Sequence, residues 1–165
     1  MILQAWVLDA EENTFTHELD IDYATSIIWI SRFQDIGEFE LYVRASKEIL
    51  ELLNNEDVFL IRDDSEYGMY IESVLLSSSA EDGDYLTIKG RSAELILLWR
   101  VVTLKSYTSA STTAEGIIRD NLNTELIPSS IFISDNYIPF LSLETAHGWE
   151  DYTTRQFTGK TLLNI

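Results

Sequence analysis

Cysteine is absent from this sequence of 165 residues, and glycine occurs only seven times. The absence of cysteine excludes disulfide bonds, thiolate-bound zinc and a cysteine nucleophile. The glycines are scattered one at a time, so the sequence has no glycine-rich phosphate-binding loop. No apolar run approaches the roughly twenty residues that a membrane-spanning helix requires. The N-terminal residues lack a basic leader, and their apolar run is too short for a signal peptide, so we expect synthesis in the cytoplasm.

Basic residues are also scarce. Against 28 aspartates and glutamates stand 11 lysines and arginines, which gives a formal net charge of −17. This balance disfavours nucleic-acid binding through phosphate contacts, because those contacts need lysine and arginine to displace counterions. It equally disfavours docking on an anionic membrane. The simplest interpretation of the charge is solubility through self-repulsion.

Residues for catalysis or metal binding are few and form no motif. His17 and His147 are the only histidines, and neither lies in a metal-binding or nucleophile-elbow pattern. Carboxylates gather in Leu19–Tyr23 and in Ser77–Asp84, but the later ligands of a calcium-binding loop are missing, so both segments are expected to be solvated loops. The sequence therefore predicts no catalytic, cofactor-binding or metal-binding residue, no cofactor, and no enzymatic activity.

The segment Ile27–Val43 gives the strongest structural signal. Ile27–Phe33 is apolar on both faces and predicts an inner strand covered on each side. Glu38–Arg44 alternates apolar and polar residues, which predicts a half-buried strand. The short turn between them contains Gly37, which is expected to adopt a positive φ. Together these features predict a β-hairpin.

The rest of the chain alternates further strands with short helices. Three helices are expected, with N-caps at Ser46, Ser92 and Thr112; Glu115 completes a capping box with Thr112. Asn54 and Asn55 are expected to end the first helix, because asparagine tolerates the left-handed conformation. Asp82–Gly83 is a hairpin signal inside the predicted loop. Further strands are predicted at Ile2–Asp9, Thr14–Leu19, Val58–Ile61, Met69–Leu76, Tyr85–Gly90, Val101–Lys105, Ile131–Ser134 and Tyr152–Phe157.

Large aromatic residues offer an alternative to a purely structural interpretation. Trp6 and Trp29 lie in strand patterns and Trp99 ends an apolar helix, so each is expected in the core. Trp149 follows His147 in an irregular segment and is the candidate for an exposed aromatic, which could stack on a sugar.

These patterns predict an α+β protein, mainly antiparallel β, built as a barrel or sandwich with two or three short helices. The first domain is predicted to span residues 1–105. Residues 106–165 form a helix-plus-strand segment, which is expected to begin a further domain, because the chain stops inside an apolar pattern at Gly159–Ile165.

Three blocks of sequence resemble a known protein family. They resemble the ReqiPepy-type tail-tip proteins of siphophages and prophages that infect Gram-positive bacteria. The residues that carry the resemblance are Trp29, Arg32, Phe33, Gly37, Glu38, Phe39, Glu40 and Leu41, then Tyr85–Ser92, and near the end Gln156–Leu163.

The resemblance implies a fold and an assembly role. The family is similar to phage baseplate-hub proteins, whose N-terminal barrel is related to the tail-tube fold and which assemble as trimers. It implies a structural virion protein of the distal tail that links the tail tube to host-recognition parts. The partners would be further copies and other tail or baseplate proteins, with DNA passing through a central channel whose acidic wall repels it.

Two alternatives remain open at this point. One is a carbohydrate-binding module of a host-adhesion device, which Trp149 would serve. The other is the N-terminal part of a tail-associated cell-wall hydrolase, whose catalytic domain would follow Ile165.

Overall fold

The computed structural model describes residues 1–9, 12, 14–32, 35–55, 57–65, 67–81, 83–99, 105–107, 113–127, 141–149 and 155–157. The chain forms two compact units, Met1–Leu95 and Ile96–Ile165, which are described separately below. The predicted division at residues 105/106 stays a prediction.

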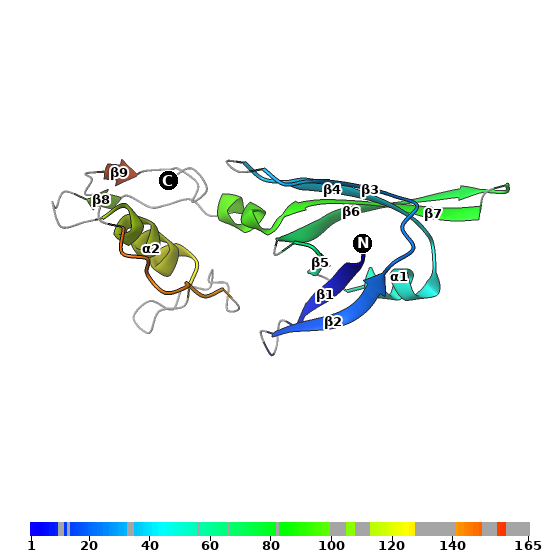
Figure 1. The fold of residues 1–165 in the computed structure, drawn as a ribbon, viewed down its shortest axis with the longest axis horizontal. Coiled ribbons are helices and arrows are strands. Elements are labelled where there is room, and N and C mark those ends of the chain that lie inside the picture. The colour runs from blue at the N-terminus through cyan, green and yellow to red at the C-terminus, as the bar shows by residue number, and fades with distance from the viewer. Residues whose placement is uncertain are drawn as a thin grey trace. The chain divides into compact units, whose positions relative to one another are not determined.

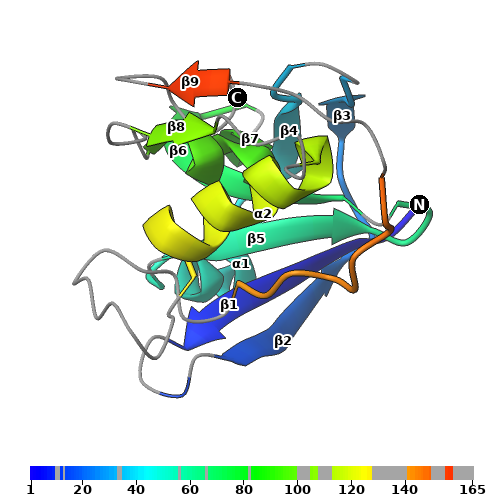
Figure 2. The ribbon, with the colours of Figure 1, turned by 90° about the vertical axis from the view of Figure 1, so that its left-hand side faces the viewer.

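The first unit is built on one antiparallel sheet of seven strands, in the order β2-β1-β5-β6-β7-β4-β3 (Figure 1). The sheet curls into a half-barrel, as Figure 2 shows, and its two edges are β2 and β3. The predicted fold class, mainly antiparallel β with few short helices, is confirmed at this level; the closer likeness to a tail-tube barrel stays a prediction. The strands are β1 (Leu3–Asp9), β2 (Thr14–Ile21), β3 (Ser26–Ile30), β4 (Glu38–Arg44), β5 (Val58–Arg62), β6 (Gly68–Ser79) and β7 (Gly83–Ser92).

Alternating side chains fill the inside of the curl. On β4, Phe39, Leu41 and Val43 are buried, whereas the residues between them face outward. The helix α1 (Lys47–Leu52) adds Ile49 and Leu52 to the same core. Each fully buried side chain of this size contributes about 1.5–3 kcal/mol of transfer free energy, so this core is the main source of stability. The predicted alternation of Glu38–Arg44 is confirmed.

The prediction of an inner strand at Ile27–Phe33 is wrong. The strand β3 ends at Ile30, pairs with β4 in the register Trp29–Phe39, and forms an edge of the sheet. Ile28 is 53% exposed and Ile30 is 38% exposed. The apolar pattern on both faces therefore reflects a strand whose outer face is left uncovered by the described residues; Phe33 lies outside them.

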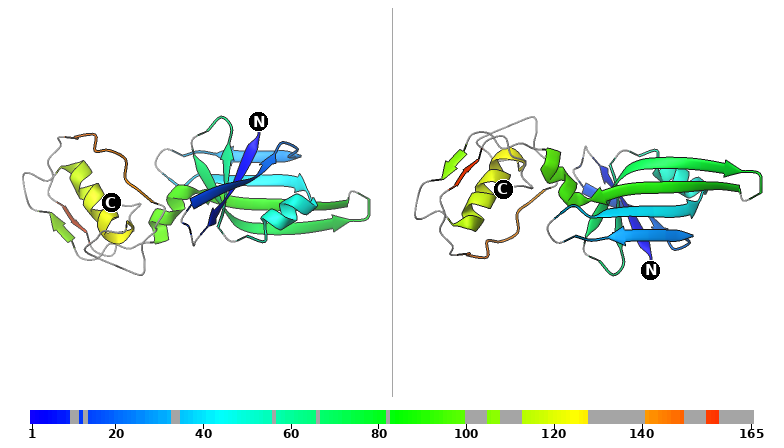
Figure 3. Two further views of the ribbon diagram at one scale, coloured as in Figure 1. Left: turned by 90° about the horizontal axis from the view of Figure 1, so that it is seen from below. Right: turned by 90° about the horizontal axis from the view of Figure 1, so that it is seen from above.

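The prediction of a loop at Ser77–Asp84 is also wrong, because most of this segment belongs to strands β6 and β7. β6 and β7 pair as far as Ser79 and Gly83 and so form a long hairpin, which projects beyond the neighbouring strands in Figure 3. Gly83 has a φ of +85°, which confirms the Asp82–Gly83 hairpin signal. Periodicity did not reveal this extension, because serine is a weak strand former whose place here is set by cross-strand pairing.

Gly37 and Ser92 form a junction that local patterns did not predict. Gly37 does not have a positive φ; instead, a side chain there would lie 2.6 Å from the carbonyl oxygen of Ile30. The buried hydroxyl of Ser92 accepts a hydrogen bond from the Gly37 N–H at 2.9 Å, so Ser92 belongs to β7 and does not cap a helix through its side chain. Glycine is required at position 37 because the backbone of Ile30 approaches it too closely for a side chain.

The end of α1 differs from its prediction, although its beginning is confirmed. The Ser46 hydroxyl accepts from the Ile49 N–H at 3.3 Å and caps the helix. Neither Asn54 nor Asn55 has a positive φ. The Asn55 side chain instead donates to the carbonyl oxygen of Leu52 at 2.9 Å, which satisfies a backbone group that the helix end leaves open.

The second unit contains a helix and a small apolar cluster. The 3₁₀-helix η1 (Ala93–Trp99) leads into it, and the other elements are β8 (Lys105–Tyr107), α2 (Ala114–Glu125) and β9 (Arg155–Phe157). β8 and β9 pair antiparallel. On α2, Ile117 is buried with Ile96 and Leu126. The predicted strand Ile131–Ser134 and residues 101–104 and 152–154 of two further predicted strands lie outside the described residues.

The beginning of α2 corrects the predicted capping box. Thr113 is the N-cap, and its hydroxyl accepts from the Gly116 N–H at 2.9 Å; Thr112 lies outside the described residues. Glu115 accepts hydrogen bonds from residues 147–149. Its partners lie far along the chain, so a local motif could not identify them.

Candidate interaction surface

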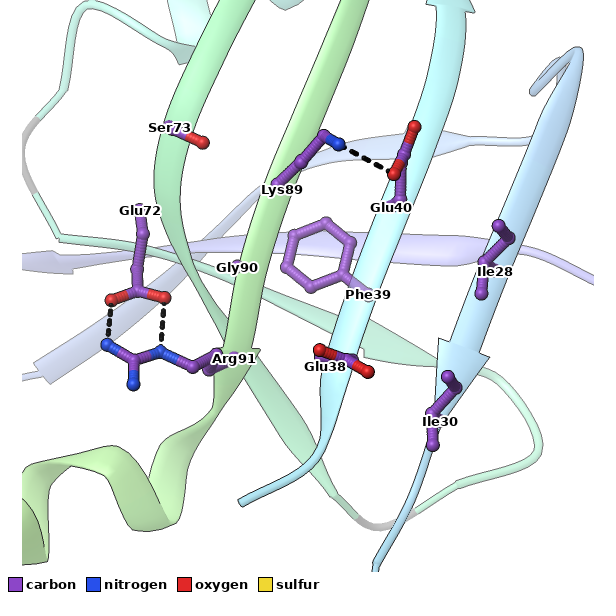
Figure 4. A pocket seen from close by; sticks show the side chains of 10 residues that line it. All are labelled: Ile28, Ile30, Glu38, Phe39, Glu40, Glu72, Ser73, Lys89, Gly90 and Arg91. Carbon is purple, nitrogen blue, oxygen red and sulfur yellow. Dashed lines mark hydrogen bonds and ion pairs between the residues drawn. The ribbon is translucent and has the colours of Figure 1, made fainter.

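A hollow of about 470 Å³ lies on the outer side of β3, β4, β7 and β6 in the first unit (Figure 4). We call it the outer hollow. It is open to solvent, with charged side chains over its floor and two isoleucines at one margin. The residues that line it are Ile28, Ile30, Glu38, Phe39, Glu40, Glu72, Ser73, Lys89, Gly90 and Arg91.

Strand register brings these side chains together. Successive residues of a strand point to opposite faces, so the residues beside the buried Phe39 face outward. Glu40 pairs with Ile28 on one side and with Lys89 on the other. Two residues earlier on β4, Glu38 pairs with Ile30 and Arg91 in the same way. The sequence positions of β3, β4 and β7 thus produce two parallel rows of outward side chains.

The floor of the outer hollow depends on Gly90. A Cβ at this position would lie 1.8 Å from the carbonyl oxygen of Tyr70 and 2.6 Å from Cε1 of Phe39. The pairing of β6 with β7 is interrupted between Ile71 and Ser73, which places Glu72 at a β-bulge. The bulge and the missing side chain let β6 approach β7 closely.

Ion pairs cover the floor and balance its charge. Lys89 lies 2.8 Å from Glu40, Arg32 lies 2.7 Å from Glu38, and the Arg91 guanidinium donates to both oxygens of Glu72 at 2.6 Å. The bonds from Arg91 lower the pKa of Glu72, and the same bonds raise the pKa of Arg91. Three carboxylates thus meet three cations in a chain whose net charge is −17.

Ile28 and Ile30 give the outer hollow an apolar margin at the edge of the sheet. Within the part of the chain that the structure describes, β3 pairs with β4 alone, so its other side presents unpaired backbone groups. An exposed strand edge is a template for pairing with another chain. The margin can therefore bind a β-strand through its backbone and an apolar side chain through the isoleucines.

The β6–β7 hairpin carries a second exposed apolar region. Val74, Leu75 and Leu76 are 43%, 63% and 55% exposed. Because they are consecutive, they project to both faces of the hairpin. Apolar groups exposed on both faces are typical of a segment that another chain covers.

His17 and His147, which the sequence offered for chemistry, are not among the residues that line the outer hollow. His17 contacts Asp20 at 2.9 Å and meets the Trp6 ring edge-on, and His147 lies 3.6 Å from Glu144. Among the described residues, no group of three or more acidic or histidine side chains is placed to hold a metal ion. The prediction that no residue is catalytic or cofactor-binding stays a prediction.

Three of the tryptophans can be compared with their predictions. Trp6 and Trp29 are partly buried, and Trp29 packs against the core of the first unit. Trp149 is 52% exposed, which confirms it as an exposed aromatic. The Trp99 side chain lies outside the described part of the structure.

Sequence reasoning missed the outer hollow as a unit. The blocks that carried the family resemblance contain Arg32, Glu38 and Glu40 as well as Lys89 to Arg91, but nothing local showed that they meet. The sequence offered one signal for this surface, the outward position of Glu38 and Glu40 in the alternating pattern of β4. The register that brings them beside Lys89 and Arg91 could not be predicted, because pairing between distant strands determines it.

Comparison with known proteins places the chain in a family. Within the described ranges, no helix has both the length and the apolar character to cross a membrane. A search of curated proteins finds no match. The family model for the Siphovirus ReqiPepy6 Gp37-like protein matches residues 4–163, nearly the whole chain. The family predicted from the sequence is thereby confirmed, and the chain belongs to the Siphovirus ReqiPepy6 Gp37-like protein family.

Proposed function

We propose that this protein is a structural component of the distal tail, a baseplate-hub protein that joins the tail tube to host-recognition parts. Membership of the family suggests a siphovirus structural protein in the virion tail. The observation that carries the finer proposal is the outer hollow, with its unpaired edge strand and balanced charge. The protein acts through assembly and without catalysis.

The edge strand β3 is suited to self-association. Natural sheets protect their edges with lysine, proline or short charged strands. β3 has the sequence Ser-Ile-Ile-Trp-Ile, which contains none of these, and it exposes Ile28 and Ile30. A neighbouring copy that covers this edge removes both isoleucines from water and pairs the backbone.

Charge favours the same surface for contact between copies. Two copies with a net charge of −17 repel each other over most of their surfaces. At the outer hollow, Glu38, Glu40 and Glu72 each have a cationic partner. Contact there brings together carboxylates that each have a cationic partner, which lowers the electrostatic repulsion between two copies.

A ring follows if β3 of one copy meets β2 of the next. The two strands are opposite edges of one sheet, so their contact is heterologous, and a heterologous contact closes into a ring when its rotation fits. We propose a trimeric ring with DNA passing through its centre. The excess carboxylates would face the bore and repel the phosphates of the DNA.

Sedimentation velocity on purified protein tests the assembly. The wild type is expected to sediment as a trimer at high concentration. Ile28→Asp is expected to reduce the association constant at least about tenfold, because it places a charge in an apolar contact. The matched control is Leu50→Asp, which alters a leucine that is 44% exposed on α1 and belongs to neither edge strand, and its association is expected to be unchanged.

Three results would contradict this proposal. One is a wild type that remains monomeric at the highest attainable concentration. The second is an Ile28→Asp variant that associates like the wild type. The third is dissociation of the assembly by Ile28→Asp but not by Phe15→Asp on β2, which would show that β3 does not pair with β2 of the next copy.

A further inference from the structure

A buried carboxylate holds one loop of the second unit in place. The Glu115 side chain is 9% exposed. It accepts hydrogen bonds from three consecutive backbone N–H groups, those of His147 at 2.7 Å, Gly148 at 2.7 Å and Trp149 at 3.0 Å. These bonds, that of His147 foremost, lower the pKa of Glu115 to about 2. Bonds to an ionised carboxylate are about twice as strong as neutral ones, so the loop backbone is firmly fixed.

Arg119 strengthens the attachment. Its Nε donates to Glu115 at 3.0 Å, and its guanidinium also donates to the carbonyl oxygen of Glu144. Gly148 has a φ of +74°, so the chain turns between His147 and Trp149 while all three amides reach one carboxylate. The loop is thus held by α2 at both of its ends.

The fixed backbone displays two aromatic rings to solvent. The His147 side chain is 59% exposed, and Trp149 is 52% exposed. Their ring centroids lie 6.4 Å apart, and the ring planes differ by only 18°. The Glu144 carboxylate, 83% exposed, lies 3.6 Å from Nε2 of His147. Two nearly parallel rings therefore stand beside a hydrogen-bonding carboxylate.

An anchored but exposed tryptophan needs an explanation. An aromatic ring in water contributes nothing to the core, yet buried polar groups of the protein hold this loop in place. The chemistry of the rings selects the ligand. One face of a pyranose ring presents C–H groups that suit the electron-rich face of an aromatic ring, while hydroxyl groups at its rim suit a carboxylate and an imidazole.

Other ligand classes fit less well. A protein interface needs about 1,000 Å² with several apolar side chains, whereas Ser142, Glu144 and Thr145, which precede these rings in the same segment, are polar and exposed. Nucleic acid stacks on aromatic rings but also needs a basic groove, and the chain has a net charge of −17. A single sugar ring needs neither.

We propose that residues 144–149 form a carbohydrate-binding ledge, in which Trp149 and His147 stack on a pyranose ring and Glu144 accepts hydrogen bonds from its hydroxyl groups. Glu115 is a positioning residue that fixes the loop. This goes beyond the proposed function, because it gives the protein a direct contact with a cell-surface polysaccharide. The ledge is open, so one copy binds weakly, and several copies in one assembly gain avidity.

Saturation-transfer difference NMR tests the ledge. The full chain is mixed with each of a set of defined oligosaccharides, β-linked tetramers of glucose and of N-acetylglucosamine among them, at up to about 10 mM, a range that detects weak binding. Saturation is expected on the ring C–H protons of at least one sugar. Trp149→Ala is expected to weaken that binding about tenfold or more, and Trp149→Phe less.

Two further variants separate contact from positioning. Tyr67→Ala removes a tyrosine that is 60% exposed in the first unit and is expected to leave sugar binding unchanged. Glu115→Gln is expected to weaken binding and to speed amide exchange at residues 147–149, while Trp149→Ala leaves that exchange slow.

Sugar binding and assembly can fail independently. The ledge is overturned if no oligosaccharide in the set receives saturation, or if Trp149→Ala binds like the wild type. Trp149→Ala is expected to sediment like the wild type, so a loss of sugar binding with intact rings supports the ledge. A monomeric wild type that still binds sugar would contradict the proposed assembly and leave the ledge standing.

Discussion

Different kinds of interaction stabilise the two compact units of this protein, each considered by itself. Met1–Leu95 encloses a continuous apolar core between a curled sheet and α1, and charged side chains line the outer hollow on its other face. In Ile96–Ile165 the described apolar cluster is small, and a buried carboxylate at Glu115 fixes the loop that ends in Trp149. Packing thus dominates the first unit, whereas in the described part of the second unit a polar centre at Glu115 joins residues that lie far apart in the sequence.

This difference separates two kinds of surface. Packing sets the strand register in the first unit, and this register, with the β-bulge at Glu72, arranges the side chains of the outer hollow. In the second unit a hydrogen-bonded carboxylate fixes a short loop, which displays two aromatic rings. A change in the core should therefore affect the first unit throughout, whereas loss of Glu115 should affect the loop first.

The largest effect is expected from Gly90→Ala. Its Cβ would lie 1.8 Å from the carbonyl oxygen of Tyr70, so β6 and β7 must separate. We expect destabilisation of the first unit by about 4 kcal/mol or more, measured by denaturant unfolding. The control is Gly68→Ala, whose Cβ would have its nearest neighbour at 3.8 Å and which should be neutral or slightly stabilising. Equal stability of the two variants would refute the close approach at Gly90.

An intermediate effect is expected from loss of the Glu115 charge. Glu115→Gln should raise amide exchange rates at His147, Gly148 and Trp149 about tenfold or more, while amides of Leu41 and Leu60 in the first unit remain protected. Hydrogen-exchange NMR measures both groups of amides in one sample. Unchanged exchange at the three loop amides would contradict the anchoring role.

The same carboxylate predicts a dependence on pH. Folding lowers the pKa of Glu115 from its ordinary value of 4.5 to about 2. A lowered folded-state pKa gives stability that is present above pH 4.5 and is lost as the pH falls toward 2. Loop amide exchange, corrected for its intrinsic pH dependence, should therefore rise as the pH falls across this range in the wild type. In Glu115→Gln this additional rise should be absent, and its persistence would assign it to another group.

The smallest effect is expected at the ion pairs of the outer hollow. Lys89 and Glu40 are 54% and 43% exposed, and such pairs typically contribute about 0–1 kcal/mol. Lys89→Ala should therefore change the free energy of unfolding little, yet it leaves Glu40 without this partner and should weaken self-association in sedimentation velocity. A large loss of folding stability in this variant would show that the ion pair supports the fold and not the contact surface.

Local patterns in the sequence predicted much of the first unit. Alternation identified β4, Ser46 identified the start of α1, and Asp82–Gly83 identified the turn of the long hairpin. They could not tell that β3 is an edge, because apolar residues on both faces suit either an inner strand or an edge that another chain covers. Gly37 and Ser92 meet across a sequence separation of 55 residues, so neither could be assigned from its neighbours.

The candidate sites show the same limit. Trp149 was recognisable as an exposed aromatic, because it lies in irregular chain outside every periodic pattern. The role of Glu115 was not, since its three donors lie 32 to 34 residues away. The outer hollow needed the register of three strands, which pairing over the whole first unit determines.

Immunogold electron microscopy of intact phage particles that carry this protein tests the proposed tail role most directly. Antibodies against the purified chain are expected to label the distal end of the tail, at the junction with the host-recognition parts. Gold confined to the capsid, or its absence from particles whose tail tips are accessible to a control antibody, would contradict a role at the tail tip.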